Sequence, residues 1–306
     1  SGPSKLWVND GKGMFSESRQ KFGISNAQAH DVGIEDLNGD SFPDIFLILH
    51  GDSSKVFFND GSGNFTDSQQ NLGKVGDNPQ TVVLGDIDGD NDVDAFITYS
   101  RLPNRLWVND GHGIFARSDI EYGGSTSPLM FVIDFNGDQS LDLFFCYIDQ
   151  PGKVLINDGS GNFTEIDQGI GKQEGCDGVD SGDIDGDGDN DIVVTSIKNG
   201  ITIWLNEHNT GTFIESGPEF YPGTINVKLF DADLDGNLDL IAANILENET
   251  RWWLNNGNGL FIPTDQLFGN SWASSIAVGK LDTDDAFDVV VGNKNDSDGI
   301  EVYFGE

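Results

Sequence analysis

Short apolar runs alternate with polar, glycine-rich turns along the whole chain, and no segment shows the period of an amphipathic helix. The runs recur in a fixed order. An alternating run leads into an acidic loop, and a nearly continuous apolar run follows the loop. A third run ends in Asn-Asp-Gly, and a fourth begins with Phe; one copy comprises Val82–Leu84, Asp94–Thr98, Leu106–Asn109 and Phe115. The pattern predicts four short strands per repeat, with the second buried on both faces.

Six such repeats follow one another at intervals of about 49 residues. This spacing predicts an all-β fold, a β-propeller of four-stranded antiparallel blades, in a single domain over residues 1–306. Residues 1–3 resemble a cloning scar. The chain begins and ends with a third strand, around Leu6–Asn9 and Ile300–Phe304, so we expect strands from both termini to close the ring. Third strands number seven and the other strands six, so six blades are predicted, with seven as the alternative.

Between the first and second strands lies a nine-residue loop with Asp or Asn at positions 1, 3, 5 and 9. Four acidic side chains so close together repel one another unless a cation lies among them, and oxygen ligands suit Ca²⁺. An EF-hand needs Glu at position 12, where the first copy has Leu47, and flanking helices. Five copies are intact, and their predicted ligands are Asp36, Asn38, Asp40, Asp44; Asp86, Asp88, Asp90, Asp94; Asp134, Asn136, Asp138, Asp142; Asp183, Asp185, Asp187, Asp191; Asp231, Asp233, Asp235 and Asp239.

The sixth copy, at residues 280–288, has Lys280 at position 1. An ammonium group there would lie near Asp282, Asp284 and Asp288 and could neutralise them without a metal ion. We therefore predict about five Ca²⁺ sites and a metal-free sixth loop.

Acidic residues outnumber basic ones by 52 to 16, and the formal net charge is −36. This charge disfavours nucleic acid and anionic membranes as partners, and no apolar run is long enough for membrane insertion. Sites of this kind fill at the millimolar Ca²⁺ found outside cells, so we expect an extracellular, cell-surface or periplasmic location. Cys146 and Cys176 either form a disulfide or are two separate buried thiols.

The Asp-x-Asp-Gly-Asp loop and the hairpin Leu106-Trp-Val-Asn-Asp-Gly-His-Gly-Ile-Phe115 together resemble the FG-GAP/VCBS repeat family. That family includes the calcium-binding propellers of integrin α subunits, propeller-type fungal lectins and many secreted bacterial proteins. The resemblance covers nearly the whole chain and implies calcium coordination by positions 1, 3, 5 and 9. It does not identify a ligand, because one fold serves many functions.

The acidic loops and the Asn-Asp-Gly hairpins should share one rim of the propeller, where the repeats are regular. Loops on the opposite rim differ from repeat to repeat, and variation of this kind is typical of a recognition surface. Aromatic rings beside polar groups suit either a glycan or a protein partner, although any single ring can instead pack between blades. The candidate ligand-binding residues are His30, His50, Tyr99, Arg101, Tyr122, Tyr221 and Trp272.

These observations favour a noncatalytic, calcium-stabilised extracellular recognition module, lectin-like and carbohydrate-binding. One alternative is a protein-binding adhesion or scaffold propeller. The other is a polysaccharide lyase or hydrolase, because His30 and His50 should lie together near Tyr99 and Arg101 and could abstract a proton. Asp is too abundant for any carboxylate pair to be diagnostic of a hydrolase.

Overall fold

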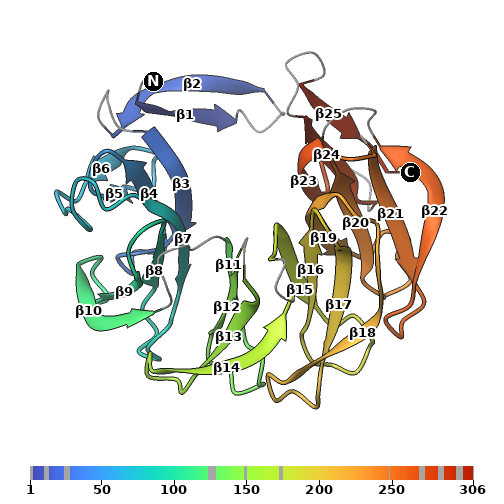
Figure 1. Cartoon of the computed structure of the whole chain (residues 1–306). Helices are drawn as coiled ribbons and strands as arrows, with labels where there is room; N and C mark the ends of the chain where they lie inside the picture. The colour runs from blue at the N-terminus through green and yellow to red at the C-terminus, as the bar shows by residue number, and fades with distance from the viewer. Residues whose placement is uncertain are drawn as a thin grey trace. The chain divides into compact units, whose positions relative to one another are not determined.

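The structure is a computed structural model that describes residues 3–9, 14–23, 28–122, 129–147, 150–171, 175–247, 249–268, 273–281, 286–293 and 299–305. Every regular element in this part of the chain is a β-strand (Figure 1). Its residues form no helix that could cross a membrane. The chain divides into two compact units, one of residues 1–130 with 158–162 and one of residues 131–157 with 163–306.

The first unit holds a two-stranded sheet and two four-stranded sheets. The strands of the two-stranded sheet are β1 (Ser4–Asn9) and β2 (Phe15–Phe22). The four-stranded sheets consist of β3 (Gln28–Glu35), β4 (Asp44–His50), β5 (Lys55–Asn59) and β6 (Phe65–Asp67), and of β7 (Pro79–Gly85), β8 (Asp94–Tyr99), β9 (Asn104–Asn109) and β10 (Phe115–Tyr122).

The second unit holds three four-stranded sheets and one three-stranded sheet. The first two consist of β11 (Leu129–Ile133), β12 (Asp142–Cys146), β13 (Gly152–Asn157) and β14 (Phe163–Ile170), and of β15 (Gly178–Gly182), β16 (Asp191–Ser196), β17 (Gly200–Asn206) and β18 (Phe213–Phe220). The others consist of β19 (Thr224–Phe230), β20 (Asp239–Asn244), β21 (Glu249–Asn255) and β22 (Phe261–Phe268), and of β23 (Ala273–Gly279), β24 (Asp288–Asn293) and β25 (Ile300–Tyr303).

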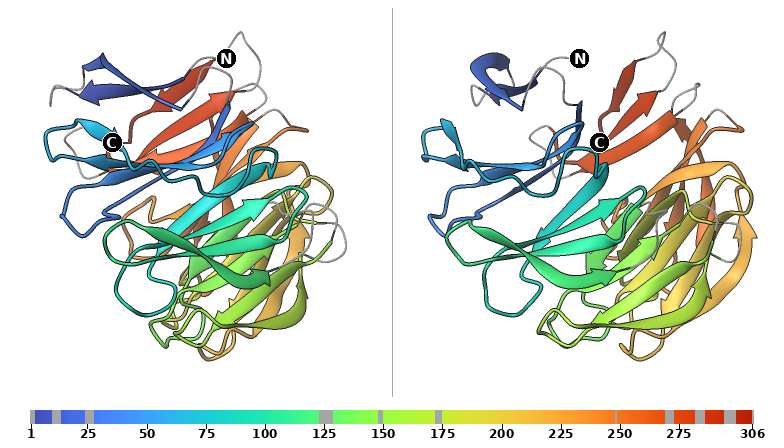
Figure 2. Two further views of the ribbon diagram at one scale, coloured as in Figure 1. Left: turned by 90° about the vertical axis from the view of Figure 1, so that its left-hand side faces the viewer. Right: turned by 60° about the vertical axis from the view of Figure 1, so that its left-hand side comes forward.

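Within each unit, consecutive sheets pack through their first strands, β3 beside β7, β15 beside β19, and β19 beside β23 (Figures 1 and 2). Each four-stranded sheet is an antiparallel meander, and its second strand is buried, as in β8 and β16. The apolar core fills the space between neighbouring sheets. This arrangement confirms the all-β propeller fold class, with six first strands. Both candidate third strands at the termini, β1 and β25, are formed, and closure of the ring by both termini stays a prediction.

A glutamine in or just after the fourth strand joins each of several sheets to the following hairpin, a feature that was not predicted from the sequence. Gln70 donates from Nε2 to the carbonyl of Gly113 at 2.7 Å and accepts the backbone N–H of Phe115 at 2.9 Å. Gln20 and Gln168 repeat both hydrogen bonds at their own junctions. The spacing of Gln five residues after the strand-leading Phe is visible in the sequence and could have been found there.

Cys146 and Cys176 form a disulfide with a Cα–Cα distance of 5.3 Å. Cys146 ends β12, and Cys176 lies just before β15. The bond therefore connects two neighbouring sheets of the second unit. The sequence left open a disulfide or two separate thiols, and the structure contains the disulfide.

Candidate functional site

The acidic loops curl because their own side chains accept backbone N–H groups. In the first loop, residues 36–44, Asp36 accepts from Gly39 at 2.9 Å and from Ser41 at 2.6 Å. The Asp40 carboxylate accepts from Phe42 at 2.9 Å. The third loop, residues 134–142, repeats these bonds with Asp134 and Asp138. The side chains at positions 1 and 5 are thus held on the inside of a tight turn.

This curl needs positive φ at two positions of the loop. Gly39 and Ser41, at positions 4 and 6, have φ of 75° and 70°. In the fifth loop, residues 231–239, Leu234 and Gly236 have φ of 62° and 93°. Glycine adopts such angles at no steric cost, whereas leucine does not. Position 4 of the fifth loop is therefore a strained residue, and the sequence pattern already marks it because the other four intact loops have Gly there.

The Asp at position 9 is the buried end of each loop. Asp94 accepts the backbone N–H of Ile87 at 3.1 Å and that of Asn109 at 2.8 Å. Burial raises the pKa of Asp94 and of Asp142 to about 6, although backbone hydrogen bonds partly oppose the shift. Burial likewise raises the pKa of Asp191 to about 7. A cation beside these carboxylates would favour their charged form.

Three loops bring carboxylates close enough to share one cation. One ligand oxygen from each member of a set lies within 4.8 Å of the others. In each set one buried carboxylate oxygen, on Asp88, Asp185 or Asp231, has no hydrogen-bond partner in the described part of the chain. An all-oxygen donor set with an unsatisfied buried oxygen fits Ca²⁺. The sets are Asp86, Asp88 and Asp90; Asp183, Asp185 and Asp191; and Asp231, Asp233 and Asp239.

The sixth loop is described only at its ends, because Asp282 and Asp284 lie outside the described residues. Lys280 places its ammonium group 5.5 Å from the centre of the Phe287 ring. Asp288 accepts the N–H of Gly305 at 3.0 Å, as the other position-9 residues accept that of an Asn. The prediction that this loop holds no metal stays a prediction.

Two of the candidate ligand-binding residues lie together as predicted. The imidazole rings of His30 and His50 stack, with ring centres 4.2 Å apart and planes 17° apart. His30 Nδ1 lies 2.7 Å from the carbonyl oxygen of Gln80, and the Gln80 side-chain nitrogen lies 3.0 Å from His50 Nε2. Gln80 on β7 thus links this histidine pair to the neighbouring sheet. Arg101 is exposed in the turn between β8 and β9.

Tyr99 and Tyr122, two further candidate ligand-binding residues, are buried. Tyr99 is 1% exposed and Tyr122 is 6% exposed. Tyr99 ends the second strand of its sheet, which is buried on both faces, and it packs under the guanidinium group of Arg105. The Tyr122 hydroxyl donates to the carbonyl of Gly161 at 2.8 Å. Both rings therefore lie in the protein interior. This agrees with the alternative that an aromatic ring packs between blades instead of binding a ligand.

Tyr221 is partly buried, and its hydroxyl donates to Glu249 at 3.2 Å. Arg251 donates to the same carboxylate at 2.9 Å, and its guanidinium carbon lies 5.7 Å from the Tyr221 ring centre. Tyr221 thus faces polar partners of its own chain. Trp272 lies outside the described residues.

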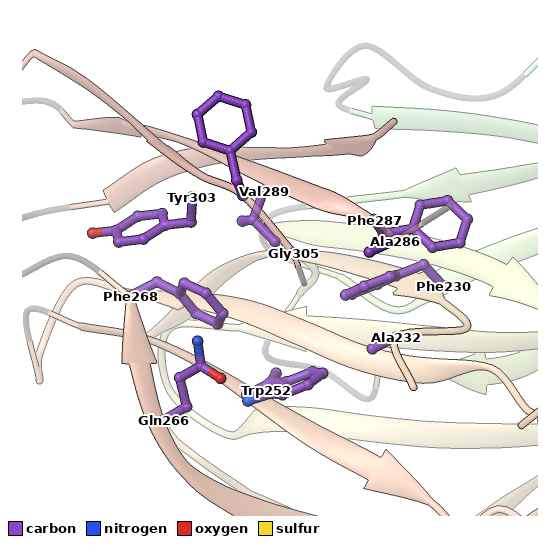
Figure 3. A pocket seen from close by; sticks show the side chains of 11 residues that line it. Phe230, Ala232, Trp252, Gln266, Phe268, Ala286, Phe287, Val289, Tyr303 and Gly305 are labelled. Atoms are coloured by element: carbon purple, nitrogen blue, oxygen red, sulfur yellow. The ribbon is translucent and has the colours of Figure 1, made fainter. Parts of the chain in front are cut away.

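An aromatic cavity of about 370 Å³ that was not predicted from the sequence lies in the second unit, between the β19–β22 and β23–β25 sheets. Figure 3 shows the rings of Trp252, Phe268, Tyr303 and Phe230 around one space, with the Gln266 side chain close to Trp252 and Phe268. Phe268 and Tyr303 meet edge to face at 5.0 Å. The indole N–H of Trp252 is buried and has no hydrogen-bond partner among the described residues. One signal was available: Trp252 occupies a third-strand position where the other copies have an aliphatic residue.

A family model described as FG-GAP-like repeat matches residues 36–97, 134–194, 183–242 and 231–291. No curated protein matches the chain by sequence. Among solved structures, a similar one is BBS1N in complex with ARL6DN, at 12% identity over 100% of this chain and 92% of that chain, with a TM-score of 0.64. A lectin from Burkholderia pseudomallei is 15% identical over 97% and 90%, with a TM-score of 0.63.

A third similar structure is the extracellular domain of a putative hybrid two-component system from B. thetaiotaomicron. It is 12% identical over 93% of this chain and 35% of that chain, with a TM-score of 0.55. At these identities the three structures share the propeller fold with this chain and carry no further information about its ligand.

Proposed function

The chain belongs to the FG-GAP-like repeat family, and from that premise we propose that it is a noncatalytic, calcium-stabilised module that binds carbohydrate outside the cytoplasm. The aromatic cavity carries the carbohydrate part of this proposal. A sugar ring offers a flat C–H face that stacks on aromatic side chains and a polar edge that needs hydrogen bonds. The cavity supplies both, through Trp252 and Tyr303 for stacking and through Trp252 Nε1 and Gln266 for the edge.

Calcium has a structural role in this proposal. The three Asp sets have geometry and chemistry suited to Ca²⁺, and each loop connects the first two strands of its sheet. When bound, the ion would neutralise carboxylates that otherwise repel one another within the loop. The residues that would hold it in the three sets all lie in the acidic loops and not in the aromatic cavity, so we assign the ion to stability and the cavity to recognition.

Three features support a location outside the cytoplasm. A disulfide between Cys146 and Cys176 is typical of oxidising compartments. One solved structure of the same fold is itself an extracellular domain. Loops of this oxygen-only type are filled at extracellular calcium concentrations.

The noncatalytic part is supported by the residues of the predicted lyase cluster. Tyr99 is buried and cannot reach a polymeric substrate. His30 and His50 stack on one another and interact with Gln80. Tyr221 is a candidate ligand-binding residue outside that cluster; burial and Glu249 raise the pKa of its hydroxyl, so less of the phenolate base is present at neutral pH. Incubation with uronate-containing polymers should produce no ultraviolet absorbance from unsaturated product, and a rise in absorbance would contradict this part.

A glycan array followed by calorimetry tests the proposal. We expect binding to at least one glycan, weakened about tenfold or more in Trp252→Phe, which keeps an aromatic ring but lacks the N–H group. Trp7→Phe serves as the matched control, because Trp7 is exposed and lies in the first unit. Binding that is equal in Trp252→Phe, Gln266→Ala and the wild type would place the site elsewhere. Binding to no glycan would favour the protein-binding alternative.

A further inference from the structure

The asparagine that ends the third strand of a sheet contacts two acidic loops at once. Asn109 donates its backbone N–H to Asp94 of its own loop at 2.8 Å. Its side-chain nitrogen donates to the carbonyl of Val93 in the same loop at 3.0 Å and to that of Leu37 in the preceding loop at 2.8 Å. Its side-chain oxygen accepts the N–H of Gly113, which fixes the amide orientation. The side-chain nitrogen of this buried residue is therefore used between two acidic loops, and its side-chain oxygen is used within its own hairpin.

The preceding loop continues the connection. The backbone N–H of Leu37 donates to Asp44 at 3.0 Å. A continuous series of hydrogen bonds therefore runs from Asp94 through Asn109 and Leu37 to Asp44. Both ends of the series are position-9 carboxylates, which are predicted ligands of two different ions.

The same series occurs twice in the second unit. Asn206 joins Asp191, at 2.8 Å, to the carbonyl of Phe135 in the third loop, also at 2.8 Å. Asn255 joins Asp239, at 2.8 Å, to the carbonyl of Ile184 in the fourth loop, at 2.7 Å. The series therefore occurs three times, and the two asparagine hydrogen bonds that join the loops agree to within 0.1 Å among the copies, which indicates a built connection between loops.

We propose that these asparagines are positioning residues that couple calcium binding in consecutive loops. An ion in one loop fixes its position-9 carboxylate and the asparagine that this carboxylate holds. The asparagine then holds the carbonyl at position 2 of the preceding loop, so that loop has less freedom left to lose when its own ion binds. The expected result is positive cooperativity between neighbouring loops. The inference rests on the calcium part of the proposed function.

The first unit offers both a test pair and a matched control. Asn59 ends the third strand of the preceding sheet and makes the equivalent bonds to Asp44 at 2.7 Å and to Pro43 at 3.0 Å in its own loop. Its side-chain bonds among the described residues stay within its own loop and hairpin. Asn59→Asp should therefore disturb one loop, whereas Asn109→Asp disturbs the connection between two.

The experiment is a double-mutant cycle on calcium affinity, measured by titration calorimetry on the whole chain. Asp40→Ala inactivates the first loop and Asp90→Ala the second. Comparing the wild type with Asp40→Ala gives the affinity of the first loop beside an intact second loop. Comparing Asp90→Ala with the double variant gives the calcium affinity of the first loop beside an inactive second loop. We expect the second value to be about fivefold weaker, as a coupling of ordinary size predicts.

In the Asn109→Asp background the difference should fall below about twofold, and in Asn59→Asp it should remain about fivefold. An additive cycle in the wild type, or equal coupling in both asparagine backgrounds, would overturn the inference while leaving calcium binding intact. Absence of calcium binding in the wild type would overturn the proposed function as well. If Asn109→Asp does not fold, the same cycle around Asn255, with Asp187→Ala and Asp235→Ala, decides the question.

Discussion

Asp94 accepts the backbone N–H of Asn109 at 2.8 Å, across the space between the start of β8 and the end of β9. The equivalent bond recurs between Asp44 and Asn59, at 2.7 Å, and between Asp191 and Asn206, at 2.8 Å. A buried carboxylate with two backbone donors is well satisfied. The carboxylate thereby closes the acidic loop and holds the Asn-Asp-Gly hairpin beside it. The sequence predicted this proximity of the loop and the hairpin.

Replacing Asp94 by Asn should destabilise the protein strongly. One Asp94 oxygen accepts the backbone N–H groups of Ile87 and Asp88, and the other accepts that of Asn109. The amide has a single accepting oxygen, so it turns its own donor toward one of these sides, and one predicted ion ligand is lost. We expect the free energy of unfolding in calcium to fall by about 2–3 kcal/mol, measured by urea denaturation. The exposed Asp119 provides the control, and Asp119→Asn should change stability little. Equal effects of the two substitutions would contradict this account of position 9.

Replacing Leu234 by Gly should stabilise the protein. Leu234 has φ of 62° at a loop position where the other intact copies have Gly, and its side chain is 55% exposed, so little burial is lost. Relief of the left-handed conformation should raise the free energy of unfolding by about 0.5–1 kcal/mol.

Leu260→Gly is the matched control for that substitution, because Leu260 is 59% exposed and does not have positive φ. Glycine adds chain entropy there without relieving strain, so stability should fall. Thermal melts of both variants decide the matter, and a loss of stability in Leu234→Gly would count against backbone strain in the fifth loop.

Replacing Gln70 by Ala should loosen the junction between two sheets. The variant loses the hydrogen bonds to Gly113 and Phe115 and leaves both backbone groups to find water. We expect a cost of about 1–2 kcal/mol in urea denaturation. Gln28→Ala, at an exposed residue of β3, should cost much less. If the two variants unfold alike, the glutamine bonds do not stabilise the junction.

Calcium affinity should depend on pH through the position-9 carboxylates. Asp94 and Asp142 have pKa values raised to about 6, and Asp191 to about 7. Because calcium needs the charged form, protons compete with it, and affinity should rise between about pH 5.5 and 8. Calorimetry at both pH values measures this change, and equal affinities would contradict it.

The calcium-free protein should show the opposite trend in stability. A carboxyl whose pKa is raised on folding contributes stability that is fully present below its unfolded value, near 3.8, and is lost as pH rises through 6 to 7. In a chelator, these groups should make the melting temperature fall from about pH 5 to pH 7.5. A rise over that interval would show that other groups dominate.

The sequence predicted the repeat, the strands and the loop geometry because each is local. The period-2 runs set the strands, and residues such as Gly39 mark the turn. It could not predict which aromatic residues are buried, because Tyr99 and Tyr122 end strands whose burial depends on the neighbouring sheet. It also missed the cavity at Trp252 and Tyr303, because these residues belong to different sheets and lie about 50 positions apart. Contacts between repeats, such as the hydrogen bond from Asn109 to Leu37, could not be predicted from the sequence for the same reason.

The melting temperature with and without calcium tests the central claim most directly. Chelation by EDTA should lower it by about 10 °C or more, since several sites each contribute binding free energy to the folded state alone. Added Ca²⁺ should restore the original value, and Mg²⁺, which prefers a smaller and more rigid octahedral site, should restore much less. A melting temperature that is the same in EDTA and in calcium would contradict a calcium-stabilised propeller.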